Sequence, residues 1–585
     1  MRLMERVLMG ASALILAGAG LTSAGNAATT PITGTTIYGA GASLPAIYMR
    51  QAFDCYAMKQ HLYFQQSPKT NTPPAVNPLA FQYHGLQCTA YNTTPGVPLL
   101  WPVVSDGVTA IRYESAGSGN GIKSIFSYDM PTILGAFGSD WASTAKPSFA
   151  LSETALDSND VSIYNNGAGA CTAGVPANAG HVGLCIDAPG VVPGAGEYAN
   201  LVSTHGALIQ LPVLIVPVTI AFDPVYEKVR QADSSVKTYS FNIRHTRTIT
   251  NPDGTTSTVA QLRLDRTAYC RIFNGDITNW NDPYLRSLNG KSMKDPTDPT
   301  PDASWSVPLQ MVGRFDSSGT STLFTRHIAK VCSSVTYVNA GVSNNYADAS
   351  GTMPAALQGP HYIKGSGSNA APAGETAGKY TLADGSDGVA EYVAFTLNPD
   401  VTPGSTLIQG RVGYISPDYV LPASLFTKAT TARLLPAALM NASGKWIDPT
   451  ASAAALAFTG LPPQSNSDGT YNAADASTDR TAPDQWVEAP HTTSYLSDPS
   501  GSSAYPIVGT DNMLTYSCHT QSRLNTIKGF LNWYESSDAI VGTQGLLSSA
   551  GFAPLPKAWR KAITQTFIAP VAATSGLNLY LHVCS

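Results

Sequence analysis

Short apolar runs alternate with segments of helical periodicity along this chain, and the alternation predicts an α/β architecture with mixed sheets. Residues 208–222 form a long β-branched run interrupted by two prolines, so we expect a strand that bends or crosses between domains. Residues 411–415 predict another strand, and residues 387–395 predict a helix. Residues 523–534 predict an amphipathic helix, because their apolar positions share one side.

Segments of turn-forming composition separate these elements. They are rich in Gly, Pro, Ser, Thr, Ala and Asn, so we expect large surface-loop insertions in the fold. The segments are residues 65–98, 159–198, 233–258, 335–379 and 465–503. A chain of 585 residues with 51 Gly, 41 Pro and only 12% charged residues is long enough for more than one domain and rich in loops.

The charge balance limits the classes of partner. A formal net charge of −5 argues against nucleic acid and against anionic membranes. Any anion that the protein binds must therefore be held by a local cluster of groups.

The first 27 residues read as a secretory signal peptide. Arg2 and Arg6 form a basic start, residues 7–21 an apolar middle, and residues 25–27 a small-residue end suited to cleavage before Ala28. No cysteine follows that would carry a lipoprotein lipid. We therefore expect a periplasmic or secreted protein.

Eight cysteines suit disulfides in an oxidising compartment. Pairing neighbours in sequence gives Cys55–Cys88, Cys171–Cys185, Cys270–Cys332 and Cys518–Cys584. Eight cysteines allow 105 connectivities, so the sequence does not fix the pairing. We choose this one because it closes the most local loops. No Cys-x-x-Cys pair exists and the ten histidines lack metal-ligand spacing, so we expect neither a metal site nor a cofactor.

Residues 314–321, Arg-Phe-Asp-Ser-Ser-Gly-Thr-Ser, have the composition of an anion site. Arg314 supplies a forked cation, and the Ser318-Gly319-Thr320 turn opens a helical pattern whose start offers free N–H groups. Taken alone, such a turn is more often a simple helix cap.

Two other segments show the same pattern, a turn with glycine and serine that opens a helix. Residues 39–48 lead through glycines into a helix for which Ser43 fits the cap, and residues 113–123 do the same around Ser118. The glycines of the second segment lack an acidic ribose partner at the usual distance, so we reject a dinucleotide loop. A fourth segment, residues 133–140, is an apolar run ending in Asp140. Together the segments predict one shared anion site.

The four segments resemble the periplasmic phosphate-binding proteins of ABC transporters, and more closely their DING-type relatives. The family motif Gly-Ala-Gly-Ala-Thr/Ser-Phe/Leu-Pro corresponds to residues 39–45, Gly-Ser-Gly/Ser-x-Gly to residues 117–121, and Arg-x-Asp/Glu-x-Ser-Gly-Thr to residues 314–320. The motif Gly-x-Ser-Asp corresponds to residues 137–140, where Gly138 misses the spacing by one. The resemblance covers most of residues 33–585, and it coincides with the Cys270–Cys332 and Cys518–Cys584 pairs.

The resemblance implies a set of phosphate ligands. They are Ser43, Leu44 through its N–H, Ser118, Asp140, Arg314, Ser318, Gly319 through its N–H, and Thr320. Asp316 would hold Arg314 in place. Asp140 would accept the proton that phosphate keeps at neutral pH, whereas sulfate has none and would meet an unpaired like charge. Arsenate should be accepted as phosphate is.

The implied fold is the two-domain periplasmic-binding-protein type II fold, in which a two-strand hinge joins the domains and the cleft closes over ligand. Domain I would comprise residues 33–213 plus 411–585, and domain II residues 214–410. The implied function is capture of inorganic phosphate for uptake or scavenging by a monomer, with an ABC transporter as a further partner. The large insertions put docking to a transporter in doubt.

Two other functions stay open. A secreted phosphatase would use Ser43, Ser118 or Ser318 as nucleophile and Asp140 as acid or base, although no activating base lies nearby in sequence. His327 follows Ser318 by about two turns of helix, where packing or capping is the expected role. A structural or adhesive exported protein could also keep this fold.

Overall fold

The computed structural model describes residues 35–58, 103–104, 106–130, 145–166, 201–251, 255–346, 351, 353–363, 372–394, 404–423, 434–487, 494–536 and 546–584. The expected signal peptide, Asp140 and three of the cysteines (Cys88, Cys171 and Cys185) lie outside these residues. No helix in the described part of the chain is long and apolar enough to cross a membrane.

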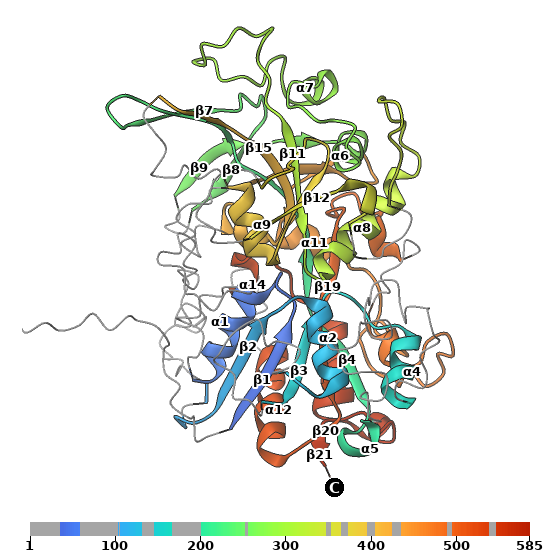
Figure 1. The fold of residues 1–585 in the computed structure, drawn as a ribbon. Coiled ribbons are helices and arrows are strands. Elements are labelled where there is room, and N and C mark those ends of the chain that lie inside the picture. Colours follow the sequence, from blue (N-terminus) through green and yellow to red (C-terminus); the bar gives the residue numbers. More distant parts are fainter. Residues whose placement is uncertain are drawn as a thin grey trace, which may run out of the picture. The chain divides into compact units, whose positions relative to one another are not determined.

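Five of the described strands form one sheet in the order β2-β1-β3-β19-β4. Their bounds are β1 Thr36–Gly41, β2 Ala110–Ser115, β3 Pro147–Ser152, β4 Leu208–Pro217 and β19 Val508–Tyr516. The first three run parallel, and β19 is antiparallel to both β3 and β4. Figure 1 shows β2, β1 and β3 side by side, and α2 (Ser118–Ser127) packs on β1 and β3.

Both faces of this sheet are buried, as expected for strands with near-continuous apolar runs. On one face Phe149 packs 5.4 Å, centroid to centroid, from Phe53 of α1 (Ala46–Tyr56), and Phe53 packs 4.9 Å from Phe530 of α12 (Gln521–Ser536). On the other face Ala150 packs with Ile125 of α2. The sheet is therefore held rigid between helices.

Six described strands form a second sheet in the order β12-β13-β11-β15-β5-β16. Their bounds are β5 Thr219–Phe222, β11 Leu309–Arg314, β12 Gln358–Tyr362, β13 Tyr380–Ala383, β15 Gly410–Ile415 and β16 Leu435–Pro436. β12, β13, β11 and β15 are parallel, whereas β5 is antiparallel to β15. Helix α9 (Gly385–Val393) packs on β11 and β15, and α8 (Gly319–Cys332) also contacts β15. The predicted mixed α/β class is confirmed.

The chain crosses between the two sheets at Val218, because β4 belongs to the first sheet and β5 to the second. The Val218 N–H donates to the Ile507 oxygen (2.9 Å), immediately before β19 returns to the first sheet. The two crossings thus lie side by side, and the run at residues 208–222 crosses as predicted. The boundaries predicted from the sequence instead have the chain return to the first domain at residue 411. Both β15 and β16 still pair within the second sheet, because the return comes only at β19.

Smaller sheets extend from this frame. They are β10 (Arg263–Leu264) with β17 (Ala438–Met440) and β18 (Trp446–Ile447); β14 (Thr406–Ile408) with β6 (Val225–Arg230) and β7 (Val236–Ser240); β8 (Thr246–Thr250) with β9 (Thr256–Ala260); and β20 (Cys518–His519) with β21 (His582–Val583). The prediction of a loop at residues 233–258 was wrong, since β7, β8 and part of β9 lie there. Threonine is β-branched and suits strands, although its frequency had favoured a loop.

The remaining helices cover the ends and edges of the sheets. The α-helices are α4 Ser158–Asn166, α5 Val202–His205, α6 Arg266–Phe273, α7 Pro283–Asn289, α11 Ala451–Ala457, α14 Leu546–Ser549, α15 Lys557–Ile563 and α16 Ala572–Ser575; the short 3₁₀ turns are η3 Ala355–Leu357, η4 Pro417–Tyr419, η5 Pro483–Gln485 and η6 Tyr495–Ser497, and η7 Thr564–Ile568 is a π-helix. The predicted helices at residues 387–395 and 523–534 are present as α9 and α12, and the strand at residues 411–415 as β15.

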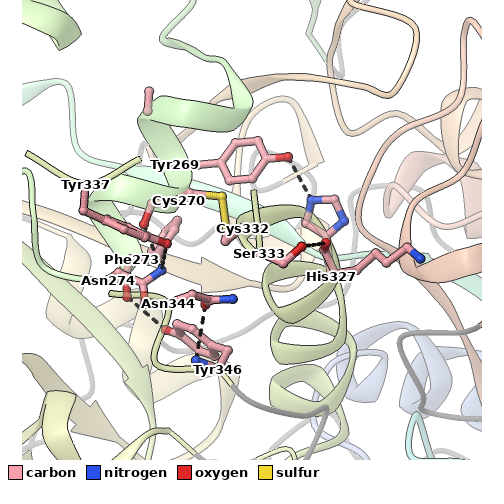
Figure 2. The surroundings of a disulfide bond; sticks show 12 residues. Tyr269, Cys270, Phe273, Asn274, His327, Cys332, Ser333, Tyr337, Asn344 and Tyr346 are labelled. Atoms are coloured by element: carbon pink, nitrogen blue, oxygen red, sulfur yellow. Dashed lines mark hydrogen bonds between the residues drawn. A yellow bond between two sulfur atoms is a disulfide. The ribbon is translucent and has the colours of Figure 1, made fainter. Parts of the chain in front are cut away.

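Two predicted disulfides are present. Cys270 of α6 is bonded to Cys332 at the end of α8, and Cys518 to Cys584. Figure 2 shows the first of these bonds beside Tyr269, whose hydroxyl lies 3.1 Å from the His327 Nε2. Cys55 is also disulfide-bonded, and its predicted partner Cys88 lies outside the described residues. The pairing of Cys171 with Cys185 stays a prediction.

The Cys270–Cys332 bond closes a loop of 62 residues. Replacing both cysteines by serine should lower the free energy of unfolding by about 4 kcal/mol, because the unfolded chain regains the freedom that the loop removed. Urea unfolding of the oxidised wild type and the double variant measures this difference. A change below about 1 kcal/mol would show that the α6–α8 packing alone holds this region.

Candidate anion-binding site

The predicted site residues follow strands whose carboxyl ends meet at one edge of each sheet. In the first sheet β1 leads to Ser43 and Leu44, and β2 leads to Ser118. In the second sheet β11 ends at Arg314 and leads into α8. Ligands of open α/β sheets bind at this position, outside the carboxyl ends of the strands.

The two edges are in direct contact. The Gly119 N–H donates to the Ser317 oxygen (3.3 Å), and the Ser386 N–H donates to the Ser43 Oγ (3.3 Å). Ser416 Oγ donates to the Leu44 oxygen (2.7 Å). Segments that are hundreds of residues apart in sequence therefore form one site. Ser43 is not the helix cap that the sequence predicted, because Pro45 holds the N-cap position of α1 and makes no side-chain cap bond.

Arg314 is the cation of the site and is fully buried. Its Nε donates to Asp316 Oδ1 (2.7 Å), its second terminal nitrogen donates to Asp316 Oδ2, and its first donates to Thr320 Oγ1 (3.2 Å). Burial opposes ionisation of both partners, yet each holds the other charged: the pKa of Asp316 is lowered by Arg314, and the pKa of Arg314 is raised by Asp316. The Gly385 N–H also donates to Asp316 Oδ1 (2.9 Å). Asp316 thus holds Arg314 in place, as expected.

The start of α8 supplies further donors. Ser318 is the N-cap, and its Oγ accepts from the Ser321 N–H (3.2 Å), so the simple capping interpretation also holds. The helix runs for 14 residues, and its first N–H groups carry the positive end of the helix dipole. The helix start lies beside Arg314, because the Arg314 guanidinium donates to the Thr320 Oγ1 in the first turn of α8.

A carboxylate that the sequence analysis did not select lies among these donors. Glu153 follows β3 directly and is only 3% exposed, and the Ser118 Oγ donates to its Oε2 (2.6 Å). Burial raises the pKa of Glu153, while Ser118, Arg314 and the Leu44 backbone N–H act in the opposite direction. The Oε1 atom is buried and has no partner at hydrogen-bonding geometry among the described residues.

Glycine is required where α8 meets this carboxylate. A Cβ built on Gly319 would lie 2.4 Å from Glu153 Oε2 and 2.6 Å from Ser118 Oγ, both well inside contact distance. Gly117 has φ +88°, and a Cβ there would lie 2.7 Å from Asp316 Oδ2. The glycines of two motifs therefore allow the two edges to approach each other.

The structure brings together every predicted site residue that it describes and adds Glu153. These residues are Ser43, Leu44, Ser118, Arg314, Ser318, Gly319 and Thr320, with Asp316 in support. Asp140 lies outside the described residues. A signal for Glu153 was present, because Ala150-Leu151-Ser152-Glu153 follows the order small-x-Ser-acid at the end of an apolar strand.

His327 has the packing role that was expected. Its Nδ1 lies 2.8 Å from the Ser497 oxygen and its Nε2 lies 3.1 Å from the Tyr269 hydroxyl. Burial lowers the pKa of His327 to about 4, so the ring is neutral at physiological pH. With both nitrogens engaged, it has none left to activate a serine.

Comparisons with known proteins agree with this architecture. Residues 199–538 match the family model of the PBP superfamily domain. The ancestral soluble variant of the Human Phosphate Binding Protein has a similar crystal structure, with a TM-score of 0.50 and 19% identity; the match covers 94% of this chain and 100% of that one. The fold is therefore the periplasmic-binding-protein type II fold.

Relatives are also found by sequence. Alkaline phosphatase L of Pseudomonas aeruginosa is 24% identical over 370 residues, which cover 63% of this chain and 68% of that protein. A phosphate-binding protein of an unknown prokaryotic organism is 25% identical over 324 residues, which cover 54% of this chain and 69% of that protein.

Loss of Asp316 tests how the site is held together. Asp316→Ala should lower the free energy of unfolding by about 3–5 kcal/mol, because the buried Arg314 charge loses its partner. Denaturant unfolding in buffer without oxyanions measures this change. The matched control is Asp302→Ala, which removes an exposed partner of Lys294 and should cost less than about 1 kcal/mol. Equal losses in the two variants would contradict the role given to Asp316.

Proposed function

Since this chain belongs to the PBP superfamily, we propose that it is an exported solute-binding protein that captures inorganic phosphate between the carboxyl edges of its two sheets. Both named relatives carry phosphate chemistry in their names, one as a phosphate-binding protein and the other as alkaline phosphatase L. Arsenate, which has the same shape and carries protons, is the other expected ligand.

One arrangement supports this function above all: donors lie around the buried carboxylate of Glu153. Arg314, Ser118 and the start of α8 supply N–H and O–H groups, and Glu153 supplies a carboxylate among them. A partly protonated oxyanion needs both kinds of partner. Its bare oxygens accept hydrogen bonds, and its one hydroxyl donates.

The energies are compatible with capture from dilute solution. A buried phosphate dianion loses its hydration, so many donors must replace water. Charge-assisted hydrogen bonds contribute roughly 1.5–3 kcal/mol each. Micromolar affinity needs about 8 kcal/mol after the cost of association, so several such bonds must act together. The ligand set proposed from the sequence supplies several such bonds. In this proposal Glu153, in place of Asp140, accepts the hydrogen bond from the phosphate hydroxyl.

The proposal includes movement of the two sheets. One domain would be built on each sheet, and the crossings at Val218 and Ile507 would form the hinge in place of the boundary at residue 411. The contacts between the edges, among them Ser386 to Ser43, would break when the cleft opens. Release from the cell envelope or delivery to an ABC transporter would then follow from the expected signal peptide.

A binding role agrees with the surroundings of the site serines better than hydrolysis does. The nearest histidine in sequence, His327, is neutral and engaged with Tyr269 and Ser497. Ser318 is occupied as the cap of α8. The absence of turnover of nitrophenyl phosphate, alongside tight binding of orthophosphate, would exclude the phosphatase alternative for this chain.

Removing the cation should abolish capture. Arg314→Ala should weaken orthophosphate binding by at least tenfold, because a charge-assisted contact with the anion is worth more than about 1.4 kcal/mol. Isothermal titration of orthophosphate into anion-free protein measures this. The control is Arg411→Ala, which removes an equally buried arginine of the same sheet that contacts Glu375 and Tyr392 instead. Loss of binding in both variants would show that disruption of the sheet, and not loss of the contact with the anion, weakens binding.

Selectivity should depend on Glu153. Glu153→Gln should admit sulfate, because an amide can donate to an oxyanion that has no proton, whereas a carboxylate repels it. Phosphate and sulfate titrations of wild type, Glu153→Gln and Asp140→Asn separate the two acids. We expect sulfate binding to rise at least tenfold only in the Glu153 variant. A rise confined to Asp140→Asn would return the role to Asp140.

A further inference from the structure

A second acid lies behind the site and has no use in the scheme above. Asp511 of β19 is fully buried, at 0% exposure. Among the described residues, neither of its carboxyl oxygens has a partner at full hydrogen-bonding geometry, and the Asn512 N–H is the one backbone donor that acts on it. A buried carboxylate without partners is costly, so its presence calls for a physical explanation.

The strand register places Asp511 beside Glu153. β19 pairs antiparallel with β3 so that Asn512 faces Ser152, Met513 faces Leu151 and Leu514 faces Ala150. Glu153, directly after β3, and Asp511, within β19, lie one position beyond the last pair of this ladder. The Glu153 charge acts on Asp511, so the two side chains lie near each other. Side chains that are directly opposite on antiparallel strands point to the same face of the sheet and lie close together. Two carboxyl groups therefore adjoin at the edge that binds the anion.

Other charged and titratable groups near the pair do not supply a counter-charge to Asp511. Arg314 acts on Glu153 but is already committed to Asp316. Arg326 of α8 donates to the Val508 backbone oxygen (2.7 Å). Tyr113 of β2 and Tyr534 of α12 feel the Asp511 charge, and burial raises the pKa of both hydroxyls, so they stay neutral. Burial, and after it the Glu153 charge, raises the pKa of Asp511 well above its ordinary range.

We propose that Glu153 and Asp511 hold one proton between them, that Asp511 carries it when the anion is bound, and that phosphate capture at alkaline pH therefore takes up a proton. This inference rests on the proposed function. Asp511 acts as a positioning residue through Glu153 and does not itself touch the ligand.

The negative charge of the pair belongs on Glu153 because the donors are there. Ser118 donates to Glu153, and Arg314 and the Leu44 N–H act on it, whereas only the Asn512 N–H acts on Asp511. With Asp511 neutral, Glu153 is free to accept the phosphate hydroxyl. When alkaline pH removes the shared proton, two negative charges adjoin the incoming dianion, and the proton must be restored before the anion binds.

The wild type by itself gives the first test. Isothermal titration of orthophosphate in buffers of different ionisation enthalpy measures protons taken up per phosphate bound. Free orthophosphate carries one proton over the range from about pH 8 to about pH 10, so uptake there is by the protein or by the bound phosphate, and the Asp511→Asn variant below separates the two. We expect uptake that approaches one proton above the upper pKa of the pair, with affinity falling about tenfold per pH unit. Zero uptake across this range would overturn the proposal.

The isosteric variant gives the second test. Asp511→Asn fixes the state in which Glu153 alone is charged, so it should bind phosphate within about threefold of the wild type near neutral pH. Its affinity should stay level where the wild type loses about tenfold per pH unit, and its proton uptake should be absent. Identical alkaline profiles for the two proteins would show that another group takes up the proton.

A failure of the proposed function looks different. In that case neither protein binds phosphate at any pH, while the pair itself still shows in the unfolding of anion-free protein. A raised carboxyl pKa stabilises the fold below the unfolded pKa and loses that effect as pH rises through the folded one. Wild type should therefore lose stability with rising pH more steeply than Asp511→Asn. Equal slopes would reject proton sharing as well.

Discussion

The structure depends on how a buried carboxylate is accommodated at an anion site. Glu153 receives the Ser118 hydroxyl and lies under the influence of Arg314, whose charge is already balanced by Asp316. Without these partners, a carboxylate facing an anion would only repel it. With them, it would be, in the function that we propose, the acceptor that distinguishes an oxyanion with a proton from one without. The strand ends, the helix starts and the glycines together place these donors around the Glu153 carboxylate.

Close approach of two sheets is what creates the site. Each edge alone offers a few N–H groups and hydroxyls, as the start of many helices does. Their meeting at Gly117 and Gly319 brings donors from three motifs close to one carboxylate. The crossings at Val218 and Ile507 are adjacent, and in the function that we propose they would form the hinge between the sheets. The same geometry would then serve both the affinity for the anion and its release.

Local signals in the sequence were reliable where one short segment carries its own physical reason. Glycine-rich turns before helices, the β-branched run at residues 208–222 and the amphipathic pattern of α12 all led to correct elements. They failed where composition replaced periodicity, as in the threonine-rich strands β8 and β9. Asp140 was selected on an imperfect motif spacing and lies outside the described residues, whereas Glu153, in the Ser-acid pair at the end of β3, was not selected.

By itself, the sequence determined the α/β class, the segments that supply the donors and the pairing of Arg314 with Asp316, because these depend on neighbours within a few residues. Only the tertiary structure showed that Glu153 lies among these donors and that Asp511 lies near it. Glu153 and Asp511 are 358 residues apart, and only the antiparallel register of β19 against β3 makes them adjacent. Such a register is a long-range choice set by packing on both faces of a sheet, and no local pattern encodes it.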